Sequence, residues 1–294
     1  MVRFLLVFLT ALVWINSDIR VAQAQESSAK TKKVLIIGID GVRPDALQAA
    51  KTPNLKALAE SGASSYEAQT GPITVSGPSW SSMLTGVWHA KHGVKDNSFN
   101  GERYAEYPHF FRRIKQANEK LATASIVHWS PINHWILSHA DYGVTRGSDE
   151  AVAKEAARYL QAENPDVLFL HFDEVDGAGH GHGYHPTIRE YMSAIERADA
   201  HVGIVLAGLR ARKTFTSEDW LILVSTDHGG KDKGHGADIP ECRTIFLIVN
   251  GSSAQPGTIT PPPTTVDIPA TAMAHLGIPV KPEWKWDGKP VGIR

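Results

Sequence analysis

The chain has 294 residues, with 30 Lys and Arg against 31 Asp and Glu, so its formal net charge at pH 7 is −1. This balance, together with the lack of any run of Lys or Arg, argues against duplex nucleic acid as the main partner. Cys242 is the single cysteine, which excludes an internal disulfide. The fold must therefore be held by its apolar core or by bound metal, and a small molecule is the expected ligand.

The N-terminal residues have the pattern of a secretory signal peptide. An arginine precedes an apolar run over residues 4–15, and Ala22-Gln23-Ala24 has the small-residue spacing of a signal-peptidase site. A membrane anchor is the alternative, but it needs roughly 18 uninterrupted apolar residues, and polar residues interrupt this run from Asn16 onward. We predict a signal peptide over residues 1–24, a single catalytic domain over residues 25–294, a periplasmic or secreted location, and no stable membrane insertion after cleavage.

Apolar, β-branched runs alternate with helical patterns along the rest of the chain. The four strongest runs do not alternate apolar with polar residues, which is typical of strands buried on both faces of a parallel sheet. A capped, acidic helix start at residues 148–150 and helical spacing of apolar residues from 188 to 209 fill two of the gaps. This alternation predicts an α/β fold, a three-layer α/β/α sandwich with a mostly parallel central sheet. The predicted strands cover residues 34–39, 124–127 (the weakest), 167–170, 221–224 and 244–249.

Three of these strands lead into acidic and histidine residues. Because ligands of open α/β sheets bind beyond the carboxyl ends of the strands, we expect these side chains to share one crevice. Mixed imidazole and carboxylate ligands suit Zn²⁺ best and admit Mn²⁺ or Fe²⁺. The alternative is that Asp-His-Gly turns arise by chance in a chain with 14 His, but three such motifs at three strand ends disfavour it. The residues are Asp40, Asp176, His180, Asp227, His228 and His235.

Several longer motifs occur in a fixed order and support a family resemblance. They are GIDGVRPD (38–45), SGPSWSSMLTGVWHAKHGVKDNSF (76–99), EVDGAGHGHG (174–183), STDHGG (225–230), KGHG (233–236), RTIFLIVNG (243–251) and VDIPATAMAHLGI (266–278). Together they resemble the type I phosphodiesterase/nucleotide pyrophosphatase branch of the alkaline phosphatase superfamily. The resemblance implies two divalent metal ions, with Zn²⁺ the best match, and a hydroxyl nucleophile. It implies one ion held by Asp176, His180 and His235. It implies another ion held by Asp40, Asp227 and His228, with the nucleophile Ser76 as a further direct ligand of this second ion.

The segment around Ser76 carries the expected substrate contacts. Ser76-Gly77-Pro78 predicts a helix start, whose unpaired N–H groups and dipole favour an anion at that point. Ser79 is the expected phosphate contact, although many members of the resembled branch carry Asn at this point. Asn97 is a further expected contact, with a turn-forming role as the alternative.

Other acidic and histidine residues are expected outside the ligand set. Asp173 and Glu174 are interpreted as supporting or surface groups. The alternative is that the motif is shifted by two or three positions, which would make them direct metal ligands. His182 and His185 are interpreted as rim or structural residues. His89 and His92 are expected to pack where the helix after Ser76 ends.

The resemblance implies a small phosphoester, nucleotide-like in some cases, as the substrate. The expected reaction is two in-line displacements through a phosphoseryl intermediate on Ser76. Charge counting favours a diester, because a monoester would call for an extra cation, which only Lys231 and Lys233 are placed to supply. A phosphomonoesterase or phosphonate hydrolase is the alternative. A sulfatase is disfavoured because Trp80 stands where the sulfatase signature has Arg, and a catalytically silent metal-binding homologue is disfavoured because all expected ligands are present.

Overall fold

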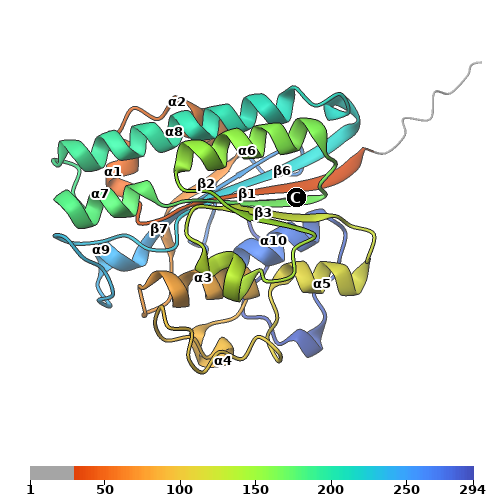
Figure 1. The fold of residues 1–294 in the computed structure, drawn as a ribbon, viewed down its shortest axis with the longest axis horizontal. Helices are drawn as coiled ribbons and strands as arrows, with labels where there is room; N and C mark the ends of the chain where they lie inside the picture. The colour runs from red at the N-terminus through yellow and green to blue at the C-terminus, as the bar shows by residue number, and fades with distance from the viewer. Residues whose placement is uncertain (1–29) are drawn as a thin grey trace, which may run out of the picture.

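The computed structural model describes residues 30–294, and the predicted signal peptide lies outside them. One eight-stranded sheet in the order β4-β3-β5-β1-β6-β7-β2-β8 forms the centre of the molecule (Figure 1). Strand β1 (Thr31–Ile39) lies between β5 (Val167–Phe172) and β6 (Glu218–Ser225) and is parallel to both. The other strands are β2 (Ala63–Gln69), β3 (Thr123–Val127), β4 (Tyr142–Thr145), β7 (Thr244–Asn250) and β8 (Gly257–Thr258).

Helices cover both faces of this sheet, which confirms the predicted three-layer α/β/α sandwich. Figure 1 shows α2, α6 and α8 on one face, and α3, α5 and α10 on the other. On the first side these are α2 (Pro53–Ser61), α6 (Asp149–Ala162) and α8 (Arg189–Arg210), with α1 (Pro44–Ala49) and α7 (Glu174–His182) nearby. On the second side they are α3 (Ser76–Thr85), α5 (Phe110–Ala117) and α10 (Asp267–His275). Short helices complete the set: α4 (His89–His92), α9 (Pro240–Arg243), a π-helical turn (Ile132–Ile136) and 3₁₀ turns (Phe215–Ser217 and Pro282–Trp284).

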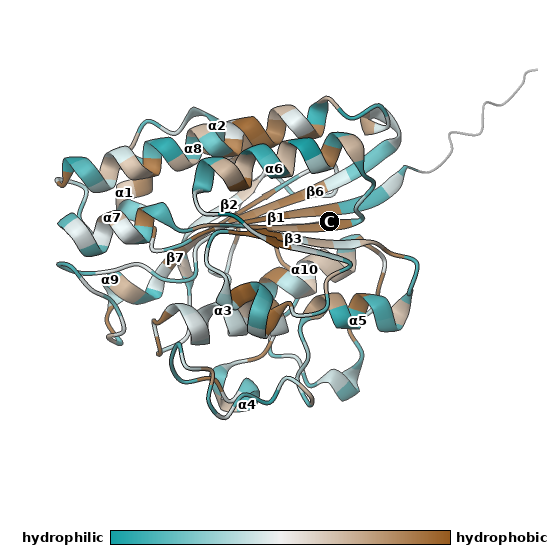
Figure 2. Ribbon diagram, viewed as in Figure 1, coloured by the Kyte–Doolittle hydropathy of each residue, from teal (hydrophilic) through white to brown (hydrophobic). Residues whose placement is uncertain are grey.

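The apolar runs of the central strands supply two separate cores. Successive side chains of a strand point to opposite faces, so Leu35 and Ile37 of β1 enter the core under α6 and α8, whereas Val34 and Ile36 enter the core above α3 and α10. Figure 2 shows the central strands as predominantly hydrophobic along their length. This two-sided burial explains why the runs carry no polar alternation. Within residues 30–294, the structure contains no helix long and apolar enough to cross a membrane.

The structure corrects the expected direction of one strand and adds three others. The run at 244–249 forms β7, which is antiparallel to both β6 and β2 rather than part of a parallel set. Burial on both faces says nothing about strand direction, so the apolar run could not reveal it. Strands β2, β4 and β8 were not predicted, because β2 mixes small and polar residues and the other two are short pieces toward the sheet edges. The helix start at Ser148 is confirmed, since its hydroxyl accepts a hydrogen bond from the N–H of Ala151.

Candidate active site

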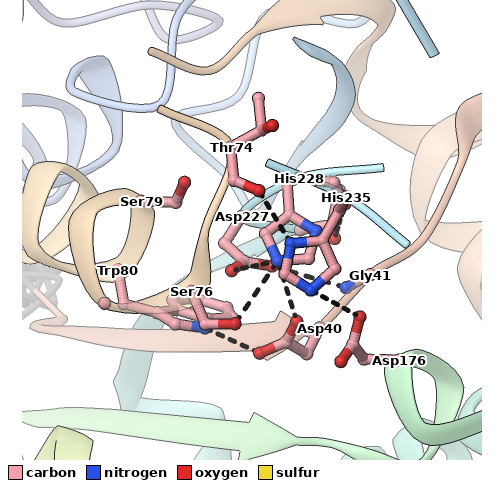
Figure 3. A network of polar contacts seen from close by, with 12 residues as sticks. Asp40, Gly41, Thr74, Ser76, Ser79, Trp80, Asp176, Asp227, His228 and His235 are labelled. Atoms are coloured by element: carbon pink, nitrogen blue, oxygen red, sulfur yellow. Dashed lines mark hydrogen bonds and ion pairs between the residues drawn. The ribbon is translucent and has the colours of Figure 1, made fainter. Parts of the chain in front are cut away.

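The carboxyl ends of β1, β5 and β6 bring the predicted acidic and histidine residues together. Asp40 follows β1, Asp227 and His228 follow β6, and Asp176 lies in the first turn of α7, which follows β5. His235 reaches the same place from the loop after β6 (Figure 3). The side chains that were expected to converge at this edge of the sheet therefore form one cluster.

The Nε2 atom of His228 is the centre of the first group. It lies 3.3 Å from Oγ of Ser76, 3.3 Å from Oδ2 of Asp227 and 3.5 Å from Oδ1 of Asp40. The ligand atoms of Asp40, Asp227 and His228 are close enough together to hold one ion. This is the group that the resemblance implied for one of two metals, and Ser76 borders it.

Each carboxylate of this group has one buried oxygen without a hydrogen-bond partner among the described residues. Within residues 30–294, Oδ1 of Asp40 and Oδ2 of Asp227 are buried atoms that accept no hydrogen bond. Burial raises the pKa of Asp40 well above its ordinary value, and the nearby carboxylate of Asp176 adds to the rise. Burial likewise raises the pKa of Asp227, with repulsion from Asp40 adding to it. A buried carboxylate oxygen without a donor is costly, so the chemistry of this donor set fits a bound cation.

Asp176, His180 and His235 form the second group. Nε2 of His180 lies 3.1 Å from Nε2 of His235 and 3.3 Å from Oδ2 of Asp176. Oδ1 of Asp176 lies 3.8 Å from Nε2 of His235. Asp176 and His180 are four residues apart on α7, so one helical turn places them on the same face. All three residues that the resemblance implied for the other metal thus contact one another. The ligand atoms of Asp176 and His235 also lie close enough to that of His228 to hold one ion, so His228 borders both groups.

All three histidines make the same kind of hydrogen bond through Nδ1. Nδ1 donates to a main-chain carbonyl in each case, namely Gly229 for His228 (2.9 Å), Lys233 for His180 (3.0 Å) and Thr74 for His235 (2.8 Å). The proton is therefore on Nδ1, and the lone pair of each Nε2 faces the cluster. This tautomer is the one in which imidazole binds metals through Nε2. Two such nitrogens 3.1 Å apart are explained well by a shared cation.

Tyr184 fixes Asp176 from the other side. Its phenol donates to Oδ1 of Asp176 at 2.5 Å, and its ring is fully buried against Gly179 and Gly230. A Cβ atom at either glycine would lie within about 2.5 Å of the ring, so neither position accepts a side chain without movement. Tyr184 was not predicted from sequence, because nothing in the motif marks it as a partner of Asp176.

Ser76 lies at the first residue of α3, as predicted, and Asn97 contacts the next residue. The side-chain Oδ1 of Asn97 accepts a hydrogen bond from the N–H of Gly77 at 2.7 Å. A Cβ atom on Gly77 would lie 2.9 Å from this same oxygen, which explains the glycine. Because Oδ1 of Asn97 is engaged in this way, its amino group is left to bind another acceptor beside Ser76.

The Ser79 side chain faces elsewhere in the structure. Its hydroxyl donates to the carbonyl of Ile73 at 3.2 Å, and Figure 3 shows it apart from the cluster. A phosphate contact from Ser79 stays a prediction and would require this bond to break.

His92 has the packing role expected of it, since it is buried and its Nε2 contacts the Ser82 hydroxyl at 3.0 Å. The N–H of Val94 binds Nδ1 of His92, so Nε2 carries the proton and His92 cannot act as a base toward Ser82.

The remaining polar residues at this edge have structural partners. The N–H groups of Asp173 and Glu174 both donate to the buried carboxylate of Asp149. The Asp173 carboxylate also lies near Asp40 and His171, and burial raises its pKa. His185 contacts Thr187 through Nδ1. His182 and His185 line a cavity beside α7 and lie outside the two ligand groups, as expected.

Two buried residues contact the candidate ligands although sequence reasoning did not assign them a role. Trp80 donates its indole N–H to Oδ2 of Asp40 at 2.9 Å, and His171 contacts the same oxygen through Nε2 at 3.2 Å. Burial lowers the pKa of His171 to about 4, so this imidazole is neutral near pH 7. The position of His171 at the end of β5 could have indicated a role at the site. Trp80 offers no such signal, because in sequence it resembles an ordinary core residue of α3.

Comparison with known proteins found curated relatives that are similar over about 70% of this chain. The chain is 25% identical over 231 residues to bis(5'-adenosyl)-triphosphatase ENPP4 of Bos taurus, which covers 70% of this chain and 49% of that protein. It is 24% identical over 239 residues to human ectonucleotide pyrophosphatase/phosphodiesterase family member 7, covering 69% and 49%. The chain spans about half the length of the curated relatives it matches.

Solved structures share the fold. An inactive variant of murine ENPP5 in complex with AMP has a TM-score of 0.69 at 16% identity, covering 85% of this chain and 96% of that one. A 2-O GAG sulfatase has a TM-score of 0.71 at 15% identity, covering 89% and 73%. The model of the type I phosphodiesterase / nucleotide pyrophosphatase family matches residues 34–142 and 119–238, which together span most of the described structure. The chain therefore belongs to the type I phosphodiesterase / nucleotide pyrophosphatase family.

Proposed function

We propose that the protein is an exported phosphodiesterase that depends on two divalent metal ions, best matched by Zn²⁺, and acts on small nucleotide-like phosphoesters through Ser76. The observation that carries the proposal is the cluster of buried, unpaired carboxylate oxygens faced by three imidazole lone pairs. Membership of the family and the names of the relatives support the class of reaction.

The two groups of residues fit two ions. Asp40, Asp227 and His228 would hold one ion beside Ser76, whereas Asp176, His180 and His235 would hold the other. When bound, divalent ions lower the pKa of a serine hydroxyl and neutralise charge on the phosphoryl group being transferred. Carboxylate and imidazole ligands in roughly equal numbers are typical of Zn²⁺ sites and also admit Mn²⁺ or Fe²⁺.

The chain's own residues account for the steps of the reaction. The deprotonated Oγ of Ser76 forms a bond to phosphorus as the bond from phosphorus to the leaving-group oxygen breaks, which leaves a phosphoseryl group. Water then attacks this group in line, restores the hydroxyl and releases the second product. We expect the amide N–H of Asn97 to bind a phosphate oxygen next to Ser76, and the bond from the N–H of Gly77 to its Oδ1 supports this role.

The charges around the cluster favour a diester over a monoester. A monoester brings nearly one more negative charge, so an ammonium or guanidinium group directed at the cluster is expected in a monoesterase. Lys231 instead binds the carboxylate of Glu241 at 3.0 Å, and Lys233 donates to the carbonyl of Gly181 at 2.9 Å. Neither of the two lysines noted in the sequence is therefore held at the ligand groups.

Sulfate esters are a weaker alternative, although sulfatases share the fold. Trp80 stands where the sulfatase signature has Arg, and its indole is fully buried and bound to Asp40. A buried indole at this point supplies no cation for a sulfate group. We therefore rank phosphomonoesters above sulfate esters as the second substrate class.

The proposal is tested by a rate comparison with purified protein. The mature chain is stripped with a chelator, reloaded with Zn²⁺, and supplied separately with a chromogenic phosphodiester, phosphomonoester, nucleotide pyrophosphate and sulfate ester. We expect activity only after reloading, with the diester or pyrophosphate preferred. A monoester preference above about tenfold in kcat/KM would replace the diester assignment, and full activity in the stripped protein would remove the metals from the proposal.

Export is tested separately. We expect the protein expressed from its full sequence to be recovered outside the cytoplasm with an N-terminus near Gln25, as determined by mass spectrometry. Recovery of the intact chain in the cytoplasm would contradict this part of the proposal.

A further inference from the structure

The two oxygens of Asp40 have different surroundings. Oδ2 is bound by Trp80 Nε1 at 2.9 Å and His171 Nε2 at 3.2 Å, whereas Oδ1 accepts no hydrogen bond within the described residues and lies 3.5 Å from Nε2 of His228. The N–H of Trp129 contacts Nδ1 of His171 at 3.4 Å, so the His171 proton is on Nε2 and is donated to Asp40. Two N–H donors thus fix one oxygen and leave the other facing the ligand group.

We propose that Trp80 and His171 are positioning residues that orient Asp40 for metal binding and tie the helix of the nucleophile to that ligand. The inference rests on the proposed function. Trp80 and His171 do not touch the phosphoester in this scheme and act only through Asp40. Their effect is therefore expected first on metal affinity and then on turnover.

The packing of Trp80 supports a fixed orientation. Its side chain is fully buried, and its ring makes edge contacts with Phe169 at 5.9 Å and with His171 at 4.9 Å between ring centroids. Beneath it, a Cβ atom on Gly38 would lie 2.4 Å from the indole. The glycine that opens the GIDG motif is thus needed for the close approach of this ring to β1, and the indole N–H has little freedom to choose another acceptor.

The position of Trp80 on α3 gives the contact a second consequence. Ser76 and Trp80 are four residues apart, and residues at this spacing share one face of a helix. The indole bond to Asp40 therefore holds α3 against the end of β1 one turn away from the nucleophile (Figure 3). One hydrogen bond thus fixes both the ligand and the distance from the ligand to Ser76.

The nearby group of Asp40, His171 and Asp173 offers an alternative use of the same oxygen. Their ligand atoms are close enough together to hold a further ion. However, the oxygen of Asp40 on this side is already bound by two N–H groups, and an ion there would have to displace them. The observed hydrogen bonds therefore favour positioning over a third metal.

The test uses zinc affinity, which can be measured without any substrate. Trp80→Phe keeps the ring and removes the N–H, and His171→Leu removes the second donor, whereas His171→Gln retains an amide N–H near Nε2. Trp220→Phe is the matched control, because its buried indole donates to Glu218 at 2.7 Å at the opposite end of the sheet. For each variant of the mature chain, Zn²⁺ affinity is measured by competition with a coloured chelator. The number of bound zinc ions is measured by elemental analysis.

Loss of an outer hydrogen bond to a metal ligand typically lowers affinity about 10–100-fold. We expect a decrease in this range for Trp80→Phe and His171→Leu, confined to one of two bound ions, with partial recovery in His171→Gln and no change in Trp220→Phe. Trp80→Phe should also lower kcat more than it raises KM at saturating Zn²⁺. Zinc affinity within twofold of the wild type in both Trp80→Phe and His171→Leu overturns the proposal, as does an equal loss in Trp220→Phe.

The outcome separates this inference from the proposed function. If the wild type binds two zinc ions but hydrolyses no phosphoester, the proposed activity fails while the affinity series still decides the positioning role. If the wild type binds no divalent ion at all, both fail. If three zinc ions bind and Trp80→Phe strengthens the third, the further ion at Asp173 replaces the positioning role.

Discussion

The two ends of the central sheet treat buried charge in opposite ways. At the amino ends of the strands, Lys33 lies 2.9 Å from Asp166, and Arg212 lies 2.6 Å from Glu218, with all four side chains buried or nearly so. At the carboxyl ends, Asp40 and Asp227 are buried together without such a partner among the described residues. Paired charges belong to the scaffold, whereas the unpaired carboxylates lie at the cation site that we propose.

The pKa values of the carboxyl groups express the same contrast. Hydrogen bonds from Arg212 and Trp220 outweigh burial and lower the pKa of Glu218 to about 2, whereas burial raises the pKa of Asp40 and Asp227. Strongly perturbed groups of the second kind are enriched at functional sites.

The largest expected effect is on catalysis at the unpaired end. Ser76→Ala should lower kcat for a phosphodiester by about 10⁴-fold or more, because the residue that forms the covalent bond is lost. Zinc content should remain at the wild-type value, since the carboxylates and imidazoles are intact. Steady-state kinetics and elemental analysis on the same sample check this, and retained turnover would refute Ser76 as the nucleophile.

At the paired end, Glu218→Gln should lower the free energy of unfolding by about 3–5 kcal/mol, because the buried guanidinium of Arg212 loses its counter-charge. The zinc affinity should not change, as Glu218 lies at the opposite end of β6 from Asp227. Urea unfolding measures the first quantity and chelator competition the second. A stability loss below about 1 kcal/mol would mean that this pair contributes as little as a surface ion pair.

At the unpaired end, the same kind of change should have the opposite sign. In the metal-free protein, Asp227→Asn should raise the free energy of unfolding by about 1–2 kcal/mol, because it removes one of two repelling buried carboxylates. Asp166→Asn is the matched control and should destabilise. Thermal melting with and without Zn²⁺ checks both, and a destabilised metal-free Asp227→Asn protein would contradict the view that this carboxylate is held there for a cation.

Acid should weaken the paired end specifically. The pKa of Glu218 is lowered from 4.5 to about 2 in the folded state, so its stabilising effect is present above pH 4.5 and is lost as the pH falls toward 2. Urea unfolding between pH 5 and pH 2 should therefore show a steeper decline for the wild type than for Glu218→Gln. Parallel curves for the two proteins would argue against the lowered pKa.

The smallest effect is expected at Ser79. Its hydroxyl is bound to the carbonyl of Ile73 rather than directed at the cluster, so Ser79→Ala should change kcat/KM for a phosphodiester by less than about tenfold. Asn97→Ala provides the comparison and should have the greater effect, because Asn97 adjoins Ser76 through Gly77. A loss above 100-fold in Ser79→Ala would restore the phosphate contact first expected from the sequence.

The sequence was most informative where a residue type indicates one structural role, such as apolar runs for strands and Asp or His at strand ends for candidate ligands. Continuous apolar runs predicted the central strands, and Asp or His after three of them predicted which side chains would converge. The direction of β7 was missed because a strand buried on both faces carries the same pattern in either direction. Strand β2 was missed because its small and polar residues have no apolar period.

The supporting residues of the site were harder to predict than its candidate ligands. Trp80 and Tyr184 are large buried rings, and in sequence they cannot be distinguished from other aromatic core residues. The Trp80 bond to Asp40 joins two segments that are distant in sequence, and the Tyr184 bond to Asp176 depends on the path of the chain after α7. The orientation of Ser79 likewise depends on the path of the loop before α3, which the local sequence does not specify.

The bonds from three imidazole rings to main-chain carbonyls bear on the proposed uptake of metal. Each bond sets its ring with the Nε2 lone pair facing the cluster, so the orientation that metal binding requires is maintained by the main chain. Burial lowers the pKa of His228 to about 3, so protons do not compete for this nitrogen in mildly acidic surroundings. When metal binds at His228, the protons that are released should accordingly come from carboxyl groups and from Ser76, and not from the imidazole.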